Sequence, residues 1–429
     1  MDDRREQTMS GHEYSTTDIS AASFWAGTVE EQERTFAHLR EHEPVSWQRP
    51  IENAVAPDPE DTGYWAVVKH ADICEVSTTS DVYCSGQGVM FDRLTPEFLE
   101  MTQSFLAMDN PRHNDLRKLV QAAFTPKRIR RIEDQVEQAA REVVDAFAGD
   151  PAGELEFVEG CAARLPLRMF SAMFGVPEHL QERTAAAAQD IVSWADPEHL
   201  AGRDPAQVQV GAAQTLHEIA GEIVADRREN PGDDLFTGLA QAEVDGQRLT
   251  DAEIGAFFVL LSVAGNDTTK HTSTLTVEHL TEHPDQRDWL VADLDGRIGP
   301  AVEEFIRYAS PVMTFCRTAT QDTELGGRRI TEGDKVVMFY ASGNRDAAVF
   351  DHPGTFDLSR EENPHVGFGG GGTHYCLGNQ LAKTMLRALF RQLLTRVPDI
   401  HVTAAPELLG TNFIRGVKRQ PVAFTPEAR

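Results

Sequence analysis

Cys376 stands between a run of four glycines and a long segment with helical periodicity. The surrounding sequence reads F-G-G-G-G-T-H-Y-C-L-G-N from Phe368 to Asn379. Backbone N–H groups at the start of a helix stabilise negative charge and lower the pKa of a thiol, so this position suits a metal-bound thiolate. Four glycines also let the backbone lie flat against a bulky planar partner. A buried, inert cysteine beside a flexible loop explains the same spacing equally well.

Other sites that use glycine or histidine motifs are excluded by spacing. A dinucleotide-binding loop needs G-x-G-x-x-G, and the sixth position counted from Gly369 is His374. A phosphate-binding loop needs Gly-Lys-Ser/Thr, which does not follow these glycines. His279 and His283 are spaced i, i+4, but the glutamate of H-E-x-x-H and a third ligand are missing. We therefore predict a solvated helix face there rather than a zinc site.

The longest helical pattern, residues 250–283, begins with a capping box formed by Thr250 and Glu253. Its middle reads A-G-N-D-T-T, and glycine and β-branched residues are poor helix formers. A groove in the helix is one explanation, because an acid beside a hydroxyl, here Asp267 and Thr268, is suited to delivering protons. The alternative is a helix kink in which the threonine hydroxyl bonds its own carbonyl four residues back.

A third pattern, E-F-I-R, places Glu304 and Arg307 at i and i+3 on one face of a predicted helix. By itself this spacing indicates an ordinary surface ion pair, which stabilises a helix only slightly.

Together, these motifs resemble those of the bacterial cytochrome P450 family of haem-thiolate monooxygenases. The segment before Cys376 is similar to the family's haem signature, F-x-x-G-x-x-x-C-x-G. It departs from that signature at one place, because Gly369 stands where the aromatic residue is expected and Phe368 is one residue earlier. The resemblance covers about Glu30 to Thr425, and its motif style is closest to actinobacterial hydroxylases of steroids and branched lipids.

The resemblance implies that Cys376 is the axial ligand of a haem b iron, where a thiolate favours O–O cleavage. It implies that Asp267 and Thr268 are catalytic and deliver protons, and that Glu304, Arg307 and Arg360 form a structural network. The implied haem-binding residues are His113, Arg117, Ala264, Gly265, Arg317, Phe368, Gly369, His374, Cys376 and Gly378. The implied substrate pocket consists of Met90, Phe91, Leu260, Val263, Val312, Met313, Phe315 and Phe413.

The chain shows no repeat and no linker, and helical patterns dominate it. We predict a mainly α fold with a minor β region, in which the resemblance places haem between the long central helix and the cysteine-bearing helix. Residues 1–20 are expected to be a mobile N-terminal tail, and residues 21–429 a single catalytic domain. Predicted helices cover 30–42, 111–124, 126–147, 161–174, 182–194, 208–228, 250–283, 285–293, 300–308 and 377–397, with strands at 63–70 and 322–341 and an irregular segment at 85–109.

Composition limits the partners and the compartment. The 40 Lys+Arg against 68 Asp+Glu leave a net charge of −28, which disfavours nucleic acid and anionic membranes. Five cysteines, an odd number without a C-x-x-C motif, indicate a reducing cytoplasm rather than a disulfide scaffold. We expect a cytoplasmic monomer without a membrane anchor.

The implied reaction inserts one atom of O2 into a hydrophobic small molecule, with a steroid, sterol or branched lipid favoured. A terpenoid or polyketide tailoring enzyme is the main alternative, and a non-catalytic haem-thiolate protein is another. Because the sequence shows no flavin or nucleotide module, electrons from NAD(P)H are expected through a ferredoxin or flavodoxin and its reductase. A basic docking patch is predicted from Lys118, Lys127, Arg128, Arg130, Arg131, Lys383, Arg387 and Arg391, although these residues also suit ordinary solvated helix faces.

Overall fold

The computed structural model describes residues 11–52, 54, 58–91, 94, 96–123, 126–194, 196–244 and 246–427, without the side chains of residues 123 and 126–130. The α-helices are α1 (Ala22–Trp25), α2 (Val29–His42), α3 (His70–Thr78), α4 (Pro96–Gln103), α5 (Arg112–Ala123), α6 (Pro126–Asp145), α7 (Arg164–Phe174), α8 (Glu178–Val192), α9 (Pro197–Leu200), α10 (Pro205–Glu229), α11 (Leu235–Gln241), α12 (Asp251–Ala264), α13 (Asp267–Glu282), α14 (Pro284–Ala292), α15 (Leu294–Ala309), α16 (Tyr340–Gly343) and α17 (Asn379–Arg396). A 3-10 helix, η1 (Ser104–Ala107), and a π-helical turn, η2 (Val158–Ala162), complete the helical elements.

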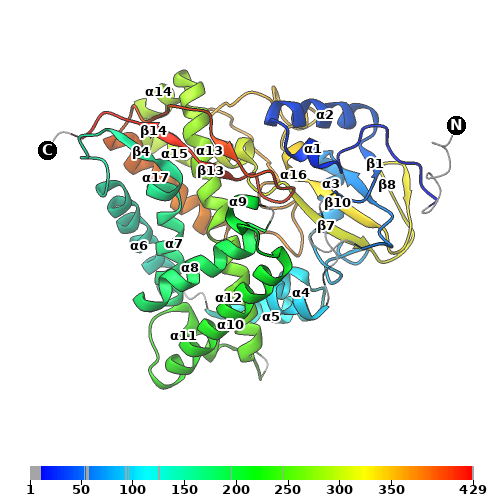
Figure 1. Cartoon of the computed structure of the whole chain (residues 1–429), viewed down its shortest axis with the longest axis horizontal. Helices are drawn as coiled ribbons and strands as arrows, with labels where there is room; N and C mark the ends of the chain where they lie inside the picture. Colours follow the sequence, from blue (N-terminus) through cyan, green and yellow to red (C-terminus); the bar gives the residue numbers. More distant parts are fainter. Residues whose placement is uncertain are drawn as a thin grey trace.

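The strands are β1 (Val45–Gln48), β2 (Tyr64–Val67), β3 (Tyr83–Cys84), β4 (Glu154–Glu156), β5 (Glu243–Val244), β6 (Gln247–Arg248), β7 (Thr314–Ala319), β8 (Thr323–Leu325), β9 (Arg328–Ile330), β10 (Lys335–Phe339), β11 (His401–Val402), β12 (Glu407–Leu408), β13 (Val417–Arg419) and β14 (Pro421–Ala423). The largest sheet has the order β1-β2-β10-β7-β3, in which only β10 and β2 are parallel. Figure 1 shows this sheet beside α1–α3 on one side of the molecule and the larger helical part on the other. The predicted mainly α fold with a minor β region is confirmed.

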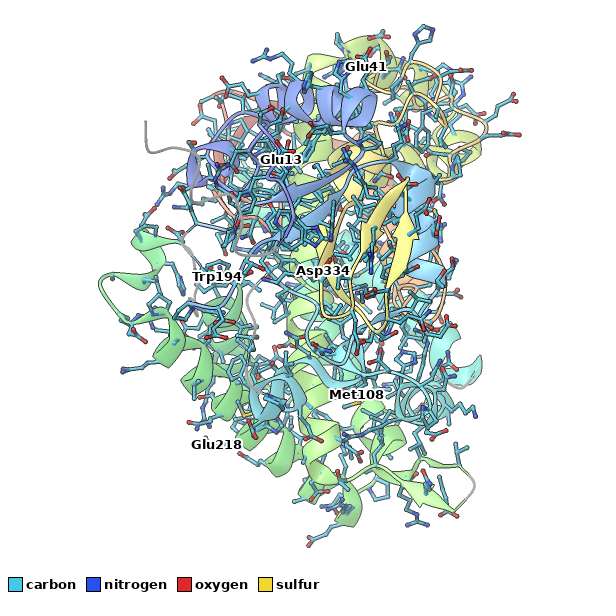
Figure 2. The ribbon with its side chains drawn as sticks, turned by 90° about the vertical axis from the view of Figure 1, so that its right-hand side faces the viewer. Glu13, Glu41, Met108, Trp194, Glu218 and Asp334 are labelled. Atoms are coloured by element: carbon cyan, nitrogen blue, oxygen red, sulfur yellow. The ribbon has the colours of Figure 1, made fainter. Side chains whose placement is uncertain are left out.

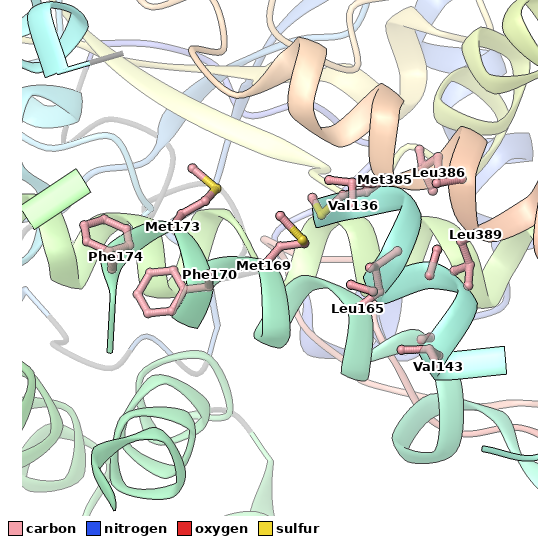
Figure 3. Packing of buried hydrophobic residues seen from close by; sticks show 14 of the residues in the cluster. Val136, Val143, Leu165, Met169, Phe170, Met173, Phe174, Met385, Leu386 and Leu389 are labelled. Carbon is pink, nitrogen blue, oxygen red and sulfur yellow. The ribbon is translucent and has the colours of Figure 1, made fainter. Parts of the chain in front are cut away.

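The main core joins the helices that surround α12 and α13. Leu165 and Met169 of α7 lie toward Met385 and Leu389 of α17 (Figure 3), whereas Phe170 packs on the rings of Phe174 and Phe258. α17 packs mainly against α6 and α15. Its apolar residues therefore recur at helical spacing along the sequence. The core therefore fixes the helix that follows Cys376.

The long central helix is divided in two. α12 ends at Ala264 and α13 begins at Asp267, so the predicted single helix over residues 250–283 is wrong at its centre. The Gly265 N–H donates to the Leu261 carbonyl (2.9 Å), and the Asn266 N–H bonds Val263 only weakly (3.4 Å). The predicted capping box at the start of α12 is confirmed.

The N-terminal segment is packed rather than mobile from residue 11 onward. The Ser15 N–H donates to the Trp47 carbonyl (2.8 Å), and Ile19 is fully buried. His12 lies 3.2 Å from a carboxylate oxygen of Asp334, the residue labelled in Figure 2. The expectation of a mobile tail is therefore wrong for residues 11–20, while residues 1–10 lie outside the described part.

The segment from Ser85 to Asp109 is less irregular than predicted, because it contains α4 and η1. Pro96 opens α4, and proline is favoured at the first position of a helix. Within the described residues, no helix is long and apolar enough to cross a membrane.

Candidate functional site

Cys376 lies in the loop between the glycine run and α17, and its backbone is held from both sides. Its N–H donates to the Phe368 carbonyl (3.1 Å), and the Asn379 side-chain amide donates to the Cys376 carbonyl (2.7 Å). α17 begins at Asn379, two residues later than the predicted start at Leu377. The loop thereby presents the thiol just before the helix.

The thiol is more strongly desolvated than the sequence indicated. Burial raises the pKa of Cys376, although the backbone N–H groups of Gly378 and Asn379 and the Arg117 guanidinium act to lower it. The lowering effect of the backbone N–H groups is as predicted, but burial outweighs it and the net shift of the Cys376 pKa is upward. A metal cation is the partner that overcomes this penalty, because coordination deprotonates a thiol outright.

The glycine run is shaped mainly by its contact with α3. Gly369, Gly371 and Gly372 have positive φ angles of 96°, 98° and 73°. A Cβ on Gly370 would lie 2.6 Å from the Ser77 hydroxyl, and one on Gly372 would overlap the Ser77 carbonyl oxygen. Only at Gly369 would a Cβ meet open space, so close approach to a flat partner is an explanation for that position and not for the whole run.

Cationic side chains from two elements lie near this loop. Arg117 of α5 donates to the carbonyls of Thr373 (2.8 Å) and Tyr375 (2.9 Å), and Arg317 of β7 donates to the Cys316 carbonyl (2.6 Å). Neither guanidinium has a carboxylate within 4.0 Å among the described residues. Both arginines therefore remain available to an anionic group.

Two imidazoles lie beside these guanidinium groups. The rings of His113 and His374 are 4.4 Å apart, and Nε2 of His113 is buried without a hydrogen-bond partner in the described part of the chain. Burial, followed by the charges of Arg317, His113 and Arg117, lowers the pKa of His374 to about 3. Both rings are therefore neutral near pH 7 and act as hydrogen-bonding groups rather than charges.

This set fits the haem that the resemblance implies. Two guanidinium groups without carboxylate partners and a buried imidazole nitrogen without a partner match the two propionates of that cofactor. Cys376 is the thiol that would meet the iron, and Gly369 leaves room beside it. Phe368 packs against the main core, with its ring 5.3 Å from Nζ of Lys383. The one-residue shift of this aromatic is thus accommodated by packing.

The break between α12 and α13 leaves space at the middle of the central helix. Ala264 is exposed although it lies in an element that crosses the molecular interior, and Leu260 and Val263 are partly exposed. The Thr268 hydroxyl donates to the Ala264 carbonyl (3.0 Å), as the kink interpretation predicted. The break and the back-bonded hydroxyl therefore coexist, and the hydroxyl oxygen can still accept a hydrogen bond.

Asp267 is buried beside that threonine, where its Oδ1 forms an ion pair with Nζ of Lys270. Nε2 of His271 lies 3.9 Å from the same oxygen. Lys270 and His271 were not identified from the sequence as part of the site. Their signal was available, since both directly follow the D-T-T motif on the same helical turns.

The structure brings the E-x-x-R residues together in the interior. Glu304 accepts two hydrogen bonds from Arg307 (2.6 and 2.7 Å) and one from Arg360 (3.3 Å). The amide of Asn363, which sequence reasoning missed, also donates to Glu304 (3.0 Å). Arg307 further donates to three loop carbonyls. The pair is thus a buried network that ties α15 to the chain before the cysteine loop, and not a surface ion pair.

Of the eight predicted pocket residues, two are buried and six are partly exposed. Phe91 and Met313 are buried in the core between the sheet and the N-terminal helices, where Phe91 meets the Tyr64 ring at 5.0 Å. The rings of Phe315 and Phe413 meet at an interplanar angle of 60° with their centroids 5.5 Å apart, and the Met313 N–H, which donates to the Phe413 carbonyl (2.9 Å), joins the two chain segments. These two rings are partly exposed, as are the remaining members: Met90, Leu260, Val263 and Val312.

Comparison with known proteins agrees with this geometry. The cytochrome P450 family profile matches residues 61–397. The methyl-branched lipid omega-hydroxylase of Mycobacterium tuberculosis is 40% identical over 411 residues, which cover 95% of this chain and 94% of that protein. The steroid C26-monooxygenase of Mycolicibacterium smegmatis is 37% identical over 397 residues, or 91% and 90% of the two chains.

Solved structures of cytochromes P450 share this fold. A Mycobacterium marinum cytochrome P450 in complex with pseudoionone has a TM-score of 0.92 and 52% identity, covering 97% of this chain and 100% of that one. CYP109E1 of Bacillus megaterium in complex with testosterone has a TM-score of 0.77 and 27% identity, covering 90% and 98%. The chain therefore belongs to the cytochrome P450 family, whose cofactor is haem iron, and it is a monooxygenase.

Proposed function

We propose that this monooxygenase hydroxylates a methyl-branched lipid of isoprenoid type, with O2 as the co-substrate. The observation that carries the proposal is that the predicted pocket residues which stay partly exposed include two aromatic rings in contact, Phe315 and Phe413, with centroids 5.5 Å apart. The other partly exposed members are Met90, Leu260, Val263 and Val312. Such a lining recognises a hydrocarbon chain by burial rather than by hydrogen bonds. The relatives that act on methyl-branched lipids and bind pseudoionone, an acyclic branched ketone, support this choice.

Steroid hydroxylation is the second candidate, favoured by the relatives named for steroid C26 and by the testosterone complex of a more distant structure. A steroid C26 methyl stands on a branched side chain, so both candidates present the same kind of terminal group. The two differ in the rigid ring system, which needs a wider pocket than an acyclic chain.

The protein's own residues have three tasks in the proposed reaction. Cys376 would hold the iron, and Arg117, Arg317, His113 and His374 would hold the propionates. Bound haem iron supplies the activation of O2 and the transfer of one oxygen atom to a C–H bond. The Thr268 hydroxyl donates its proton to the Ala264 carbonyl, so its oxygen can accept a hydrogen bond beside the helix break. The Asp267 carboxylate would exchange protons with this hydroxyl.

Electrons are proposed to come from NAD(P)H through a ferredoxin or flavodoxin and its reductase, to a cytoplasmic monomer. Among the eight predicted docking residues, Lys383, Arg391 and Arg131 are already paired with carboxylates. The side chains of Lys127, Arg128 and Arg130 lie outside the described residues. Lys118 and Arg387 have no carboxylate within 4.0 Å in the described part, so they are the proposed contacts.

Titration of the purified protein in visible light tests the substrate. A ligand that displaces water from the iron moves the Soret band to shorter wavelength, and we expect a saturable shift with pseudoionone and with a methyl-branched fatty acid. A larger shift with a steroid ketone than with either acyclic compound would favour the second candidate. A cyclic monoterpene or a polyketide as the only active ligand would overturn both.

Replacement of Phe413 with alanine tests the proposed lining. The variant loses most of the apolar area that Phe413 offers to the substrate, so we expect the Kd for the acyclic ligand to rise about tenfold. Leu408→Ala, a change at an exposed side chain on β12, is the matched control and leaves the Kd unchanged. Equal affinities for native protein and Phe413→Ala would place this ring outside the pocket.

A further inference from the structure

Three ionisable residues on the first turns of α13 are buried to an unusual degree. Asp267, Lys270 and His271 are 6%, 8% and 2% exposed. Charged side chains are rarely buried unless they are paired, and Asp267 and Lys270 are paired through Oδ1 and Nζ. The ion pair does not include His271, so it does not account for the burial of that imidazole.

The hydrogen bonds of His271 define its tautomer. The Val417 N–H of β13 donates to Nδ1 (3.2 Å), so Nδ1 carries no proton. Burial, with a smaller effect from Lys270, lowers the pKa of His271 well below its usual value, so the ring is neutral. The remaining proton is therefore on Nε2, and that nitrogen lies 3.9 Å from Oδ1 of Asp267, just beyond hydrogen-bond distance.

The imidazole is also confined from its other side. A Cβ on Gly416 would lie 3.1 Å from Nε2 of His271, so a larger residue in the tail would press against the ring. Val417 is buried in a small apolar cluster with Leu275 of the same helix. The tail strand thus holds the ring in one orientation, with its N–H directed toward the carboxylate.

We propose that His271 is a positioning residue for Asp267, whose Nε2–H takes over Oδ1 when the ion pair with Lys270 opens. An unpaired carboxylate in this interior would otherwise be strongly disfavoured, so it would turn away or take up a proton. The inference rests on the proposed role of Asp267 in proton delivery. His271 does not pass protons itself, because its Nδ1 faces a backbone amide that releases none.

Two substitutions separate the contacts of the ring. His271→Gln places an amide N–H near the position of Nε2 and retains a donor for Asp267. His271→Asn is shorter, so it retains an acceptor near Nδ1 for Val417 but does not reach the carboxylate. The measured quantity is coupling, the fraction of NADH consumption that ends in hydroxylated pseudoionone rather than in hydrogen peroxide, with a surrogate ferredoxin and its reductase.

We expect coupling to fall about fivefold in His271→Asn, the effect of one lost hydrogen bond, and to stay within about twofold of native in His271→Gln. Asp267→Asn reports separately on the proposed function and should lower coupling by at least about tenfold. Native coupling in His271→Asn beside a low value in Asp267→Asn would overturn the inference alone. Native coupling in Asp267→Asn would overturn the proposed function.

A second readout does not depend on turnover. In protein with ¹⁵N-labelled histidine, held in the diamagnetic ferrous carbon-monoxide form, the His271 signals are assigned by their loss in His271→Gln. We expect the neutral Nε2–H tautomer, and a downfield shift of that proton in Lys270→Met, where the imidazole takes over Oδ1. If that variant does not fold, Lys270→Gln makes the same change more mildly. A charged ring, the opposite tautomer or an unmoved proton would overturn the inference.

Discussion

Glu278 is a carboxylic acid that the fold holds close to its titration point at neutral pH. It is partly buried on α13, and burial, followed by the carboxylates of Glu282 and Glu30, raises its pKa from 4.5 to about 7. The unfolded chain loses this proton near pH 4.5, while the folded chain keeps it until about pH 7. Glu278 therefore lowers the free energy of unfolding progressively as pH rises through that range, with the full penalty above pH 7.

Glu278→Gln should remove this penalty. We expect the free energy of unfolding at pH 8 to rise by about 1–3 kcal/mol and to stay the same at pH 4, where both residues are neutral. Urea unfolding at the two pH values measures the difference. Glu182→Gln, the same change at an exposed side chain on α8, is the control and should change little. Equal gains at both pH values would mean that packing, rather than charge, accounts for the effect.

At the scale of elements, the site depends on how the glycine run lies on α3. Both Gly369 and Gly372 have positive φ, but only Gly372 also lies against the backbone of α3 at Ser77. The loop that carries Cys376 is thus seated on a helix from the N-terminal half of the chain. If the glycine run were displaced from α3, the thiol should move relative to Arg117, which donates hydrogen bonds to the same loop.

The two glycines form a matched pair for this idea. Gly372→Ala combines backbone strain with overlap at the Ser77 carbonyl, and we expect a loss of at least about 3 kcal/mol of stability and of most bound haem. Gly369→Ala has strain alone and should cost about 1–2 kcal/mol. Thermal unfolding and the ratio of Soret to protein absorbance measure both effects. Equal losses in the two variants would show that φ, and not the contact with α3, determines the loop.

At the scale of the whole molecule, the surface charge would determine how the proposed ferredoxin, an acidic electron donor, approaches this protein. The chain carries a net charge of −28, so most of its surface repels ferredoxins, which are themselves acidic. Several of the basic residues expected near the cysteine are neutralised by carboxylates on neighbouring elements. The attractive field at this side therefore depends on few cations, among them the exposed Lys118 and the partly exposed Arg387.

Reversal of both charges, Lys118→Glu with Arg387→Glu, should slow reduction by a ferredoxin about tenfold at low salt. The difference should shrink at high ionic strength, since salt screens exposed charges. The substrate Kd should not change. Arg328→Glu, on the β9 strand of an exposed hairpin, is the control. Reduction rates equal to native at low salt would exclude this docking surface.

The sequence by itself determined the elements whose signals are local. The capping box at Thr250 and Glu253 and the apolar stripe of α17 depend on neighbouring residues, so both were predictable. The motifs around Cys376, Asp267 and Glu304 were also recognisable, because each is a short run with fixed spacing. The helix break at Gly265 was only partly predictable, since weak helix propensity is compatible with a straight helix when tertiary packing supports it.

The tertiary structure alone decided which distant groups meet these motifs. The contact of Gly372 with Ser77 and the N–H of Val417 on His271 join residues more than a hundred positions apart. No local pattern encodes such contacts, because they arise when separate elements pack on a shared core. The same holds for charge: the ion pair of Lys383 with Glu303 removes a cation that the sequence presented as available. The motifs thus identify which residues can do chemistry. The packing of distant elements determines the protonation and orientation of those residues and the charges that surround them.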